Sequence, residues 1–210
     1  MTSTSYTSQA YDLILGRLIR RELKPGDLLD RKKIAEEMNV SLIPVSDAVQ
    51  RLTYEGFLTT RRRQGTFVST PDHDDIRGQL LLREALECQC ARLYCNGPIT
   101  KAYKKLLPLA KSADKALVSG RQVWSEDFQF HQALVALTGC AALIQCFERV
   151  VNLSMFHQTS MISPARIETY DRHTELLEEL VEMSPTEGSE RIRKHIQSGK
   201  EALLEQLLHH

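Results

Sequence analysis

Residues 30–57 read DRKKIAEEMNVSLIPVSDAVQRLTYEGF, and this stretch decides the fold of the first part of the chain. Asp30 precedes a short run, residues 31–38, in which apolar side chains recur at helical spacing, and aspartate is a favoured cap for such a helix. Ser41 is the corresponding cap of a second helical pattern, which spans about residues 44–55. Two short helices joined by a tight turn form a helix-turn-helix, so we predict this motif here.

The segments on either side of this motif fit a winged form of it. Residues 11–21 show helical spacing of apolar side chains, and KPGD at 24–27 predicts a turn after them. The runs 57–60 and 66–69 are rich in β-branched and aromatic residues and flank the basic turn RRRQG at 61–65. We therefore predict one helix before the motif and a β-hairpin, the wing, after it. The alternative is a small three-helix domain that happens to be basic.

The distribution of charge gives weak support for a polyanionic partner. The chain has 210 residues, with 27 Lys+Arg and 27 Asp+Glu, so its formal net charge is zero. Residues 1–70 nevertheless carry 11 basic and 8 acidic side chains, whereas residues 71–210 carry 16 and 19. A basic amino-terminal part on an acidic body is the arrangement expected when that part binds nucleic acid.

From residue 73 onward the pattern is helical almost throughout, with breaks at positions that contain glycine or proline. We predict six helices, near residues 73–95, 99–118, 121–138, 140–160, 164–183 and 186–208. The predicted fold class is mainly α: an amino-terminal winged helix-turn-helix followed by a carboxy-terminal all-α six-helix bundle. The corresponding domains are residues 1–70 and 79–210, with a linker at 71–78.

Cysteine usage and hydropathy indicate where the protein works. The five cysteines contain no CxxC pair and are odd in number, so we expect reduced, mostly buried thiols. They are Cys88, Cys90, Cys95, Cys140 and Cys146. No apolar run reaches the roughly 18 residues of a membrane-spanning helix. The start, MTSTSYTSQAYD, lacks the regions of a signal peptide and reads as a loose leader, so we expect a cytoplasmic protein.

Four polar side chains fall among the apolar residues of the predicted bundle helices. Asp127 and His131 are four residues apart, so in a helix both lie on one face, and that face is otherwise apolar. His173 and His195 repeat the pattern on two later helices. Because burial of an unpaired charge is costly, something must compensate it. One carboxylate and three imidazoles suit a divalent ion such as Zn²⁺, Ni²⁺ or Mn²⁺, and the alternative is a metal-free hydrogen-bonded network.

The motifs LKPGDLL, IAEEMNVS, PVSDAVQRLTYEGFL and RRRQGTFV closely resemble the winged helix-turn-helix of GntR-family bacterial transcription regulators. The resemblance covers about residues 8–70 and implies binding to operator DNA. The chain departs from the family at Leu42 and Ser46, where such proteins usually carry arginine. Arginines there typically contact guanine edges or phosphates, so the departure points away from the usual operator sequence.

The side chains expected nearest the DNA lie at the start of the third helix, on the helix before it and on the wing. Leu42 and Ile43 can touch thymine methyl groups but cannot pair with guanine, and the basic side chains are expected to contact phosphates. The predicted DNA-binding residues are Arg31, Lys32, Ser41, Leu42, Ile43, Pro44, Ser46, Arg61, Arg62, Arg63, Gln64 and Gly65, with Asp47 close to them.

The second part of the chain resembles the FCD domain, the ligand-sensing domain of the FadR subfamily of these regulators. The resemblance covers about residues 77–205 and rests on REALE at 83–87, DFQFH at 127–131, HTELLEEL at 173–180 and RKHI at 193–196. In metal-binding members one aspartate and three histidines are ligands. The corresponding residues here are Asp127, His131, His173 and His195.

Arg83 and His157 are the candidate effector-binding residues. Arg83 shares a helical face with apolar residues, so we expect it to point inward, where a guanidinium needs an anion such as the carboxylate of a small organic acid. The alternative is that Arg83 pairs only with a protein acid such as Glu87. His157 is expected either to border the site where the effector binds or to be an ordinary core or surface histidine.

Together these patterns predict a homodimeric, DNA-binding transcription regulator whose operator affinity changes when an organic acid binds beside a metal ion. One alternative is a metal-dependent enzyme that uses the same aspartate and histidines. No obvious nucleophile or general base accompanies these residues, which disfavours the enzyme. Another alternative is a regulator that responds to the metal alone.

Overall fold

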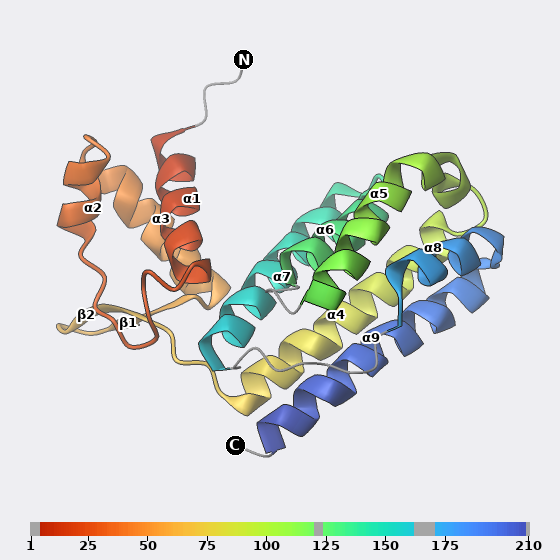
Figure 1. Cartoon of the computed structure of the whole chain (residues 1–210). Coiled ribbons are helices and arrows are strands. Elements are labelled where there is room, and N and C mark those ends of the chain that lie inside the picture. Colours follow the sequence, from red (N-terminus) through yellow and green to blue (C-terminus); the bar gives the residue numbers. More distant parts are fainter. Residues whose placement is uncertain (1–4, 120–123, 162–170, 209–210) are drawn as a thin grey trace. The chain divides into compact units, whose positions relative to one another are not determined.

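The computed structural model describes residues 5–119, 124–161 and 171–208 (Figure 1). The chain forms two compact units, the first of Met1–Ile76 with Asn152–Met161, and the second of Arg77–Val151 with Ile162–His210. The described ranges contain nine helices and one two-stranded sheet, which confirms the predicted, mainly α fold class. None of the helices in these ranges is long and apolar enough to span a membrane.

The first unit contains the predicted winged helix-turn-helix. Its elements are α1 (Tyr6–Ile19), α2 (Arg31–Glu37), α3 (Leu42–Glu55), β1 (Leu58–Arg61) and β2 (Gly65–Val68). Asp30 caps α2 as predicted, because its side chain accepts hydrogen bonds from the backbone N–H groups of Lys32 and Lys33. Gly56 ends α3 with a φ of 98°, a left-handed conformation that glycine adopts without strain.

Helix α1 begins five residues before the predicted start at Tyr11. The side chain of Ser5 accepts a hydrogen bond from the backbone N–H of Ser8, so it caps a turn that the sequence pattern did not reveal. Ala10 is fully buried, which ties this first turn to the core. The prediction of a loose leader is therefore wrong for residues 6–10.

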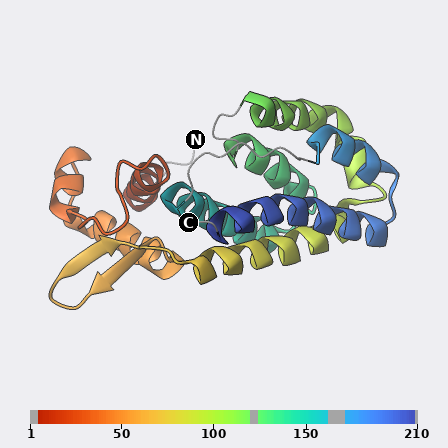
Figure 2. The same ribbon diagram turned by 60° about the horizontal axis from the view of Figure 1, so that its bottom comes forward.

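The wing is an antiparallel pair of strands with Arg61 opposite Gly65 at the turn (Figure 2). Leu28 forms an additional β-bridge with Phe67, so the segment before α2 also contacts the hairpin. Gly65 has a φ of 123°, and a Cβ atom there would lie 2.6 Å from Cδ1 of Leu28. The left-handed backbone conformation therefore favours glycine at this position, whereas the exposed side chain of Leu28 could move aside.

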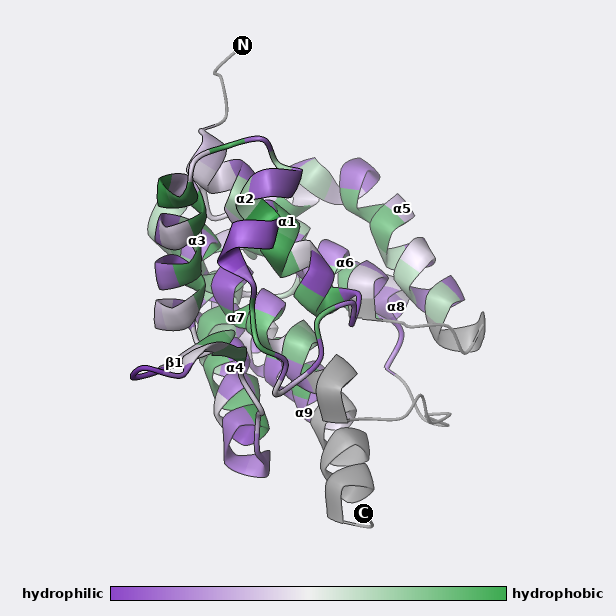
Figure 3. Ribbon diagram, turned by 90° about the vertical axis from the view of Figure 1, so that its left-hand side faces the viewer, coloured by the Kyte–Doolittle hydropathy of each residue, from purple (hydrophilic) through white to green (hydrophobic). Residues whose placement is uncertain are grey.

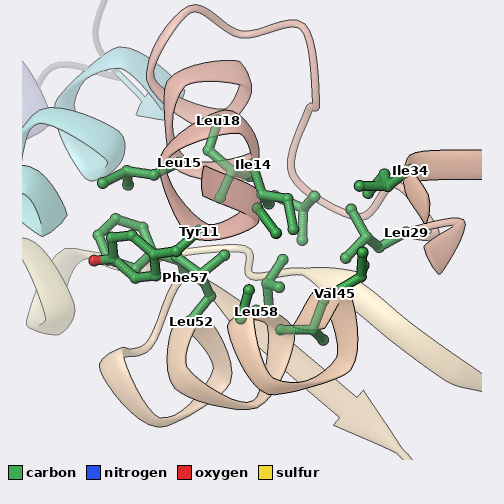
Figure 4. Packing of buried hydrophobic residues seen from close by; sticks show 14 of the residues in the cluster. Tyr11, Ile14, Leu15, Leu18, Leu29, Ile34, Val45, Leu52, Phe57 and Leu58 are labelled. Atoms are coloured by element: carbon green, nitrogen blue, oxygen red, sulfur yellow. The ribbon is translucent and has the colours of Figure 1, made fainter. Parts of the chain in front are cut away.

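The hydrophobic core of the first unit joins its three helices to the hairpin (Figure 4). Buried side chains from every one of these helices and from β1 contribute to it, among them Ile14, Ile34, Leu52 and Leu58. This core holds α3 in place, so the exposed residues at the start of α3 are presented on a rigid support.

Residues 152–161, the end of α7 (Ala141–Met161), belong to the first unit. Leu153 and Phe156 are buried members of the cluster. The ring of Phe156 lies 5.7 Å from that of Phe57, centroid to centroid, at an angle of 59°. The first unit is therefore completed by a segment that is distant in sequence.

The second unit is built from helices, as predicted. Its helices are α4 (His73–Tyr94), α5 (Pro98–Ser119), α6 (Trp124–Ala136), α7, α8 (His173–Glu182) and α9 (Pro185–Leu208). Only the part of α7 up to Val151 belongs to this unit. Helices α4 and α9 lie side by side in both views (Figures 1 and 2), and Nε of Arg92 donates to Oγ of Ser189. Helix α5 packs against both α6 and α8.

The fifth predicted helix differs from the observed one at its start. The sequence pattern predicts residues 164–183, but α8 begins only at His173, and residues 162–170 lie outside the described ranges. Asp114 of α5 accepts hydrogen bonds from the backbone N–H groups of His173 and Thr174, at 2.7 and 3.2 Å. A side chain from another helix therefore caps α8, and the local sequence does not reveal such a cap.

Candidate functional site

The second unit brings together the four side chains singled out as metal ligands. Asp127 and His131 lie on α6, His173 on α8 and His195 on α9. One ligand atom of each residue lies within 4.8 Å of those of the other three, and all four residues are buried. Helical spacing places the first pair on one face of α6, whereas the other two imidazoles come from helices packed nearby.

Two of the imidazoles are oriented by carboxylates from neighbouring helices. Nδ1 of His131 is hydrogen-bonded to Oε2 of Glu87 on α4. Nδ1 of His173 lies 3.2 Å from Oδ1 of Asp114 on α5. Because an ionised carboxylate only accepts hydrogen bonds, Nδ1 of each ring carries the hydrogen. The second ring nitrogen, Nε2, is therefore the atom directed at the cluster.

The third imidazole has a carboxylate partner of the same kind. Nδ1 of His195 lies 3.1 Å from Oδ2 of Asp171, just before α8. Arg191 holds this carboxylate through two N–H groups, and its Nε also binds Glu179. In proteins that bind metals through histidine, a carboxylate on the other ring nitrogen commonly orients the ligand. All three imidazoles of the cluster have this arrangement.

The inward-facing nitrogens fit a cation. Nε2 of His131 lies 3.2 Å from Nε2 of His195, so these two ring nitrogens face each other. Two lone pairs at this distance repel each other unless a proton or a metal ion lies between them. Nε2 of His173 lies 3.0 Å from Oδ1 of Asp127, which completes a set of three nitrogens and one oxygen. This donor set suits a borderline divalent ion.

The pKa values of two imidazoles are displaced in opposite directions. Burial lowers the pKa of His195 to about 4, so this ring is neutral at pH 7. Burial by itself also lowers the pKa of His173, but hydrogen bonds to Asp114 and Asp127 outweigh it and raise the pKa to about 9. His173 therefore holds a proton at the place where a metal ion binds an imidazole, and a metal ion would displace it.

Arg83 is part of the same network. Its Nε donates to Oε1 of Glu87 at 2.6 Å, and its Nη2 donates to Oδ2 of Asp127 at 3.1 Å. The guanidinium also lies 4.9 Å from the centre of the Phe128 ring. Burial by itself raises the pKa of Asp127, but Arg83 and the histidines outweigh it and hold that pKa well below its usual range. The alternative partner named from the sequence, Glu87, is thus a partner, and Asp127 is a second one.

His157 lies in the part of α7 that belongs to the first unit. It is buried, and its Nδ1 has no hydrogen-bond partner in the described part of the chain; the same is true of Oγ of Ser154, one turn earlier. Burial lowers the pKa of this imidazole. The effector role of Arg83 and His157 remains a prediction.

The predicted DNA-contacting residues of α3 lie at its exposed start. Ile43 is 71% exposed and Leu42 is 44% exposed, which is high for large aliphatic side chains. Ser41 is exposed, and Pro44 and Ser46 are partly exposed. This end of α3 therefore presents both aliphatic and small polar groups to solvent.

The predicted phosphate contacts lie on α2 and on the wing. Lys32, Arg62, Arg63, Gln64 and Gly65 are exposed, and the hairpin tip is hydrophilic (Figure 3). Nη2 of Arg31 donates to Oγ1 of Thr66, and the guanidinium of Arg61 lies 4.9 Å from the centre of the Phe67 ring. The hairpin therefore positions two of the cations, while the tip residues extend into solvent.

Sequence reasoning missed the carboxylates that are hydrogen-bonded to Nδ1 of the three imidazoles. The sequence indicated Glu87 only as a possible partner of Arg83, although its spacing to Arg83 placed both on one helical face. Asp171 lies two residues before His173, which is a weak signal at best. Asp114 gave no signal at all, because it is 59 residues from the imidazole that it contacts.

Two family models match the chain. The model of the gntR family of bacterial regulatory proteins matches residues 6–68, and the model of the FCD domain matches residues 80–198. The chain is 25% identical over 183 residues to the Nta operon transcriptional regulator of Aminobacter aminovorans, an alignment that covers 87% of each protein. It is also 25% identical over 135 residues to the HTH-type transcriptional repressor RspR of Escherichia coli (strain K12), covering 63% of this chain and 59% of that protein.

Solved structures show the same fold. A putative transcriptional regulator GntR from Rhodococcus sp. RHA1 superposes with a TM-score of 0.74 at 21% identity, covering 96% of this chain and 98% of that one. McbR/YncC of E. coli superposes with a TM-score of 0.70 at 20% identity, covering 98% of this chain and all of that one.

Proposed function

The chain belongs to the GntR family of bacterial regulatory proteins and carries an FCD domain, so it is a DNA-binding transcription regulator. We propose that a small organic acid, bound next to a divalent metal ion, controls its affinity for operator DNA. Members of this family are transcriptional regulators and not enzymes, which removes the metal-dependent enzyme as an alternative.

The arrangement of the three imidazoles is the observation that carries the proposal. Each has Nδ1 on a carboxylate and Nε2 directed at the cluster, and Asp127 supplies an oxygen. His131, His173 and His195 would hold Zn²⁺, Ni²⁺ or Mn²⁺ together with that oxygen. When bound, the ion supplies a residual positive charge that attracts an anionic ligand, because only one of its four protein ligands is anionic.

Arg83 supports an organic acid as the effector. Two of the five N–H donors of its guanidinium bind Glu87 and Asp127, and a carboxylate is the ligand that best matches the others. We propose that the acid is held by Arg83 beside the ion. His157, which lies in the first unit, stays a separate prediction from the sequence; its buried Nδ1 has no partner within the described residues.

DNA binding by the first unit follows from the family, and its contact residues are proposals. We propose that the start of α3 enters the major groove, while Arg31, Lys32 and the wing arginines contact phosphates. A regulator that reads a two-fold operator is itself two-fold, so we propose a homodimer. The sequence leaves the first and the fourth bundle helix, α4 and α7, as candidate interfaces, and α4 is proposed because Leu81, Leu82 and Leu93 on it are 55%, 51% and 47% exposed.

The proposal is tested by operator affinity measured against a panel of small organic acids, with metal-free and metal-loaded protein. We expect one acid to change the affinity of loaded wild type by roughly 5–150-fold, the range of a coupling of about 1–3 kcal/mol. His131→Ala and Arg83→Ala are expected to abolish this response, whereas His73→Ala, an exposed histidine outside the cluster, retains it.

The same measurement separates the remaining alternatives. A response to metal in the absence of any acid would identify a regulator that senses the metal alone. A response of both variants like that of wild type would exclude the histidine cluster and Arg83 as the sensor and leave the ion a structural role.

A further inference from the structure

The exposed face at the start of α3 carries two large aliphatic side chains among polar ones, and it carries no cation. Leu42 and Ile43 lie on it, and Asp47 and Gln50 follow Ile43 at four and seven residues, which continues the same helical face. Both Asp47 and Gln50 are exposed. A helix that enters the major groove would therefore meet the bases with two aliphatic groups, one carboxylate and one amide.

Arg51 is the one basic residue within the sequence of α3, and contacts inside the first unit hold it. Its Nε donates to Oε1 of Glu55 at 2.9 Å, and its guanidinium lies 3.9 Å from the centre of the Tyr11 ring. Tyr11 donates to the other oxygen of Glu55. These contacts direct the Arg51 side chain, which is 57% exposed, toward Glu55 and Tyr11 rather than toward the start of α3.

The first turn of α3 also has free backbone donors. Ser41 is its N-cap residue but makes no side-chain cap hydrogen bond, in contrast to Asp30 at the start of α2. The first N–H groups of a helix bind phosphate when no cap satisfies them. A phosphate at this position would bring Leu42 and Ile43 against the edges of the neighbouring bases.

Guanine is normally read by arginine or lysine, which donate to its O6 and N7, whereas the thymine methyl group is read by apolar contact and adenine by glutamine or asparagine. We propose that α3 recognises thymine, through contact of Leu42 and Ile43 with the C5-methyl group, and adenine through Gln50. These three side chains then read A·T pairs rather than guanine. This inference rests on the proposed placement of α3 in the major groove.

The test uses the full-length protein and starts from a randomised pool of duplexes, so the operator sequence need not be known. Duplexes are selected from the pool, and the enriched sequence is then synthesised with each thymine replaced in turn by uracil, which lacks only the methyl group. Thymines are expected to be enriched in both half-sites. Each contacted thymine replaced by uracil should weaken binding about fourfold, the effect of removing one buried methyl group.

Two variants and a control assign the effect to α3. Leu42→Ala and Ile43→Ala should bind the thymine and uracil duplexes about equally, because the side chain that contacts the methyl group is gone. Arg62→Ala, at the exposed wing tip, should weaken binding to both duplexes and keep their fourfold ratio. Both aliphatic residues are exposed, so circular dichroism of the variants should match that of wild type.

Enriched guanines with no effect of uracil would overturn the inference, as would a fourfold ratio that persists in both alanine variants. If wild type enriches no sequence from the pool, operator binding by this chain is refuted. This outcome differs from failure of the thymine inference, because it is seen already in the selection step.

Discussion

Asp171 illustrates at the scale of a residue how a side chain that binds no ligand can control a site. It accepts a hydrogen bond from Nδ1 of His195 and is itself held by Arg191. Asp171→Asn is expected to weaken metal affinity by about 10–100-fold, because the imidazole loses the partner that fixes its tautomer and orientation. Titration of the metal against a chromophoric chelator measures this affinity directly.

Glu179→Gln is the matched control for this variant. Glu179 binds the same Arg191 but contacts no imidazole in the described structure, so its loss should leave metal affinity within about twofold of wild type. Equal effects of the two substitutions would show that Arg191 alone, and not the carboxylate on the imidazole, supports the site.

A residue of the site could be predicted only where the neighbouring sequence shows that its position is unusual. Asp127 and His131 stand out because a polar pair on an apolar helical face needs an explanation within the sequence itself. Asp114 and Asp171 act through contacts that only packing creates. In the sequence alone, Asp114 looks like any other polar residue of an amphipathic helix.

At the scale of an element, the start of α8 depends on one carboxylate of α5. Asp114→Ala is expected to lower the free energy of unfolding by about 1–2 kcal/mol at pH 7, the typical effect of losing a cap. Glu175→Ala is the control, because Glu175 lies in the same first turn but its partner, Arg172, is exposed, and it should cost less than about 0.5 kcal/mol. Chemical denaturation of the metal-free protein measures both.

The contribution of Asp114 has a defined pH dependence. Burial by itself raises the pKa of this carboxyl, but hydrogen bonds from His173 and Thr174 outweigh it and lower the pKa from 3.8 to about 2. A carboxyl with a depressed folded-state pKa stabilises fully above its unfolded value and loses that contribution as pH falls. The difference between wild type and Asp114→Ala should therefore shrink between about pH 4 and pH 2, and a difference that is constant over this range would contradict the assignment.

The wing permits a separate prediction. Replacement of Arg62 and Arg63 by alanine should weaken DNA binding and reduce the slope of log affinity against log salt by about one for each lost phosphate contact. Lys104→Ala with Lys105→Ala is the control, since these exposed cations lie on α5 of the second unit. An unchanged slope in the wing variant would remove the hairpin tip from the DNA interface.

The elements themselves were predicted well, and their ends less so. Six helices of the second part and the order helix, helix, helix, hairpin of the first part follow from periodicity and from glycine and proline positions. The start of α1 differs because Ser5 caps a turn without a strong apolar pattern, and the start of α8 differs because its cap comes from Asp114. Caps supplied by tertiary structure leave no mark in the local sequence.

At the scale of the whole molecule, the proposed homodimer depends on α4. Leu82→Glu should shift the protein to monomer in sedimentation at micromolar concentration, because a carboxylate cannot be buried unpaired in an apolar interface. Leu82→Met, which keeps the volume and the apolar character, should remain dimeric. A wild-type protein that sediments only as monomer at these concentrations would exclude the dimer itself.

The turn of the wing has a consequence for how such a regulator evolves. Gly65, with its left-handed φ, sets the backbone of the turn, while Arg62 and Gln64 are exposed to solvent. If the wing contacts DNA as proposed, substitutions of these two exposed residues alter how fully a promoter is occupied without adding to the cell's load of misfolded protein. Any amino-acid substitution at Gly65 is strained at its φ of 123° and adds to that load, so promoter occupancy can drift in small steps while the scaffold stays under purifying selection.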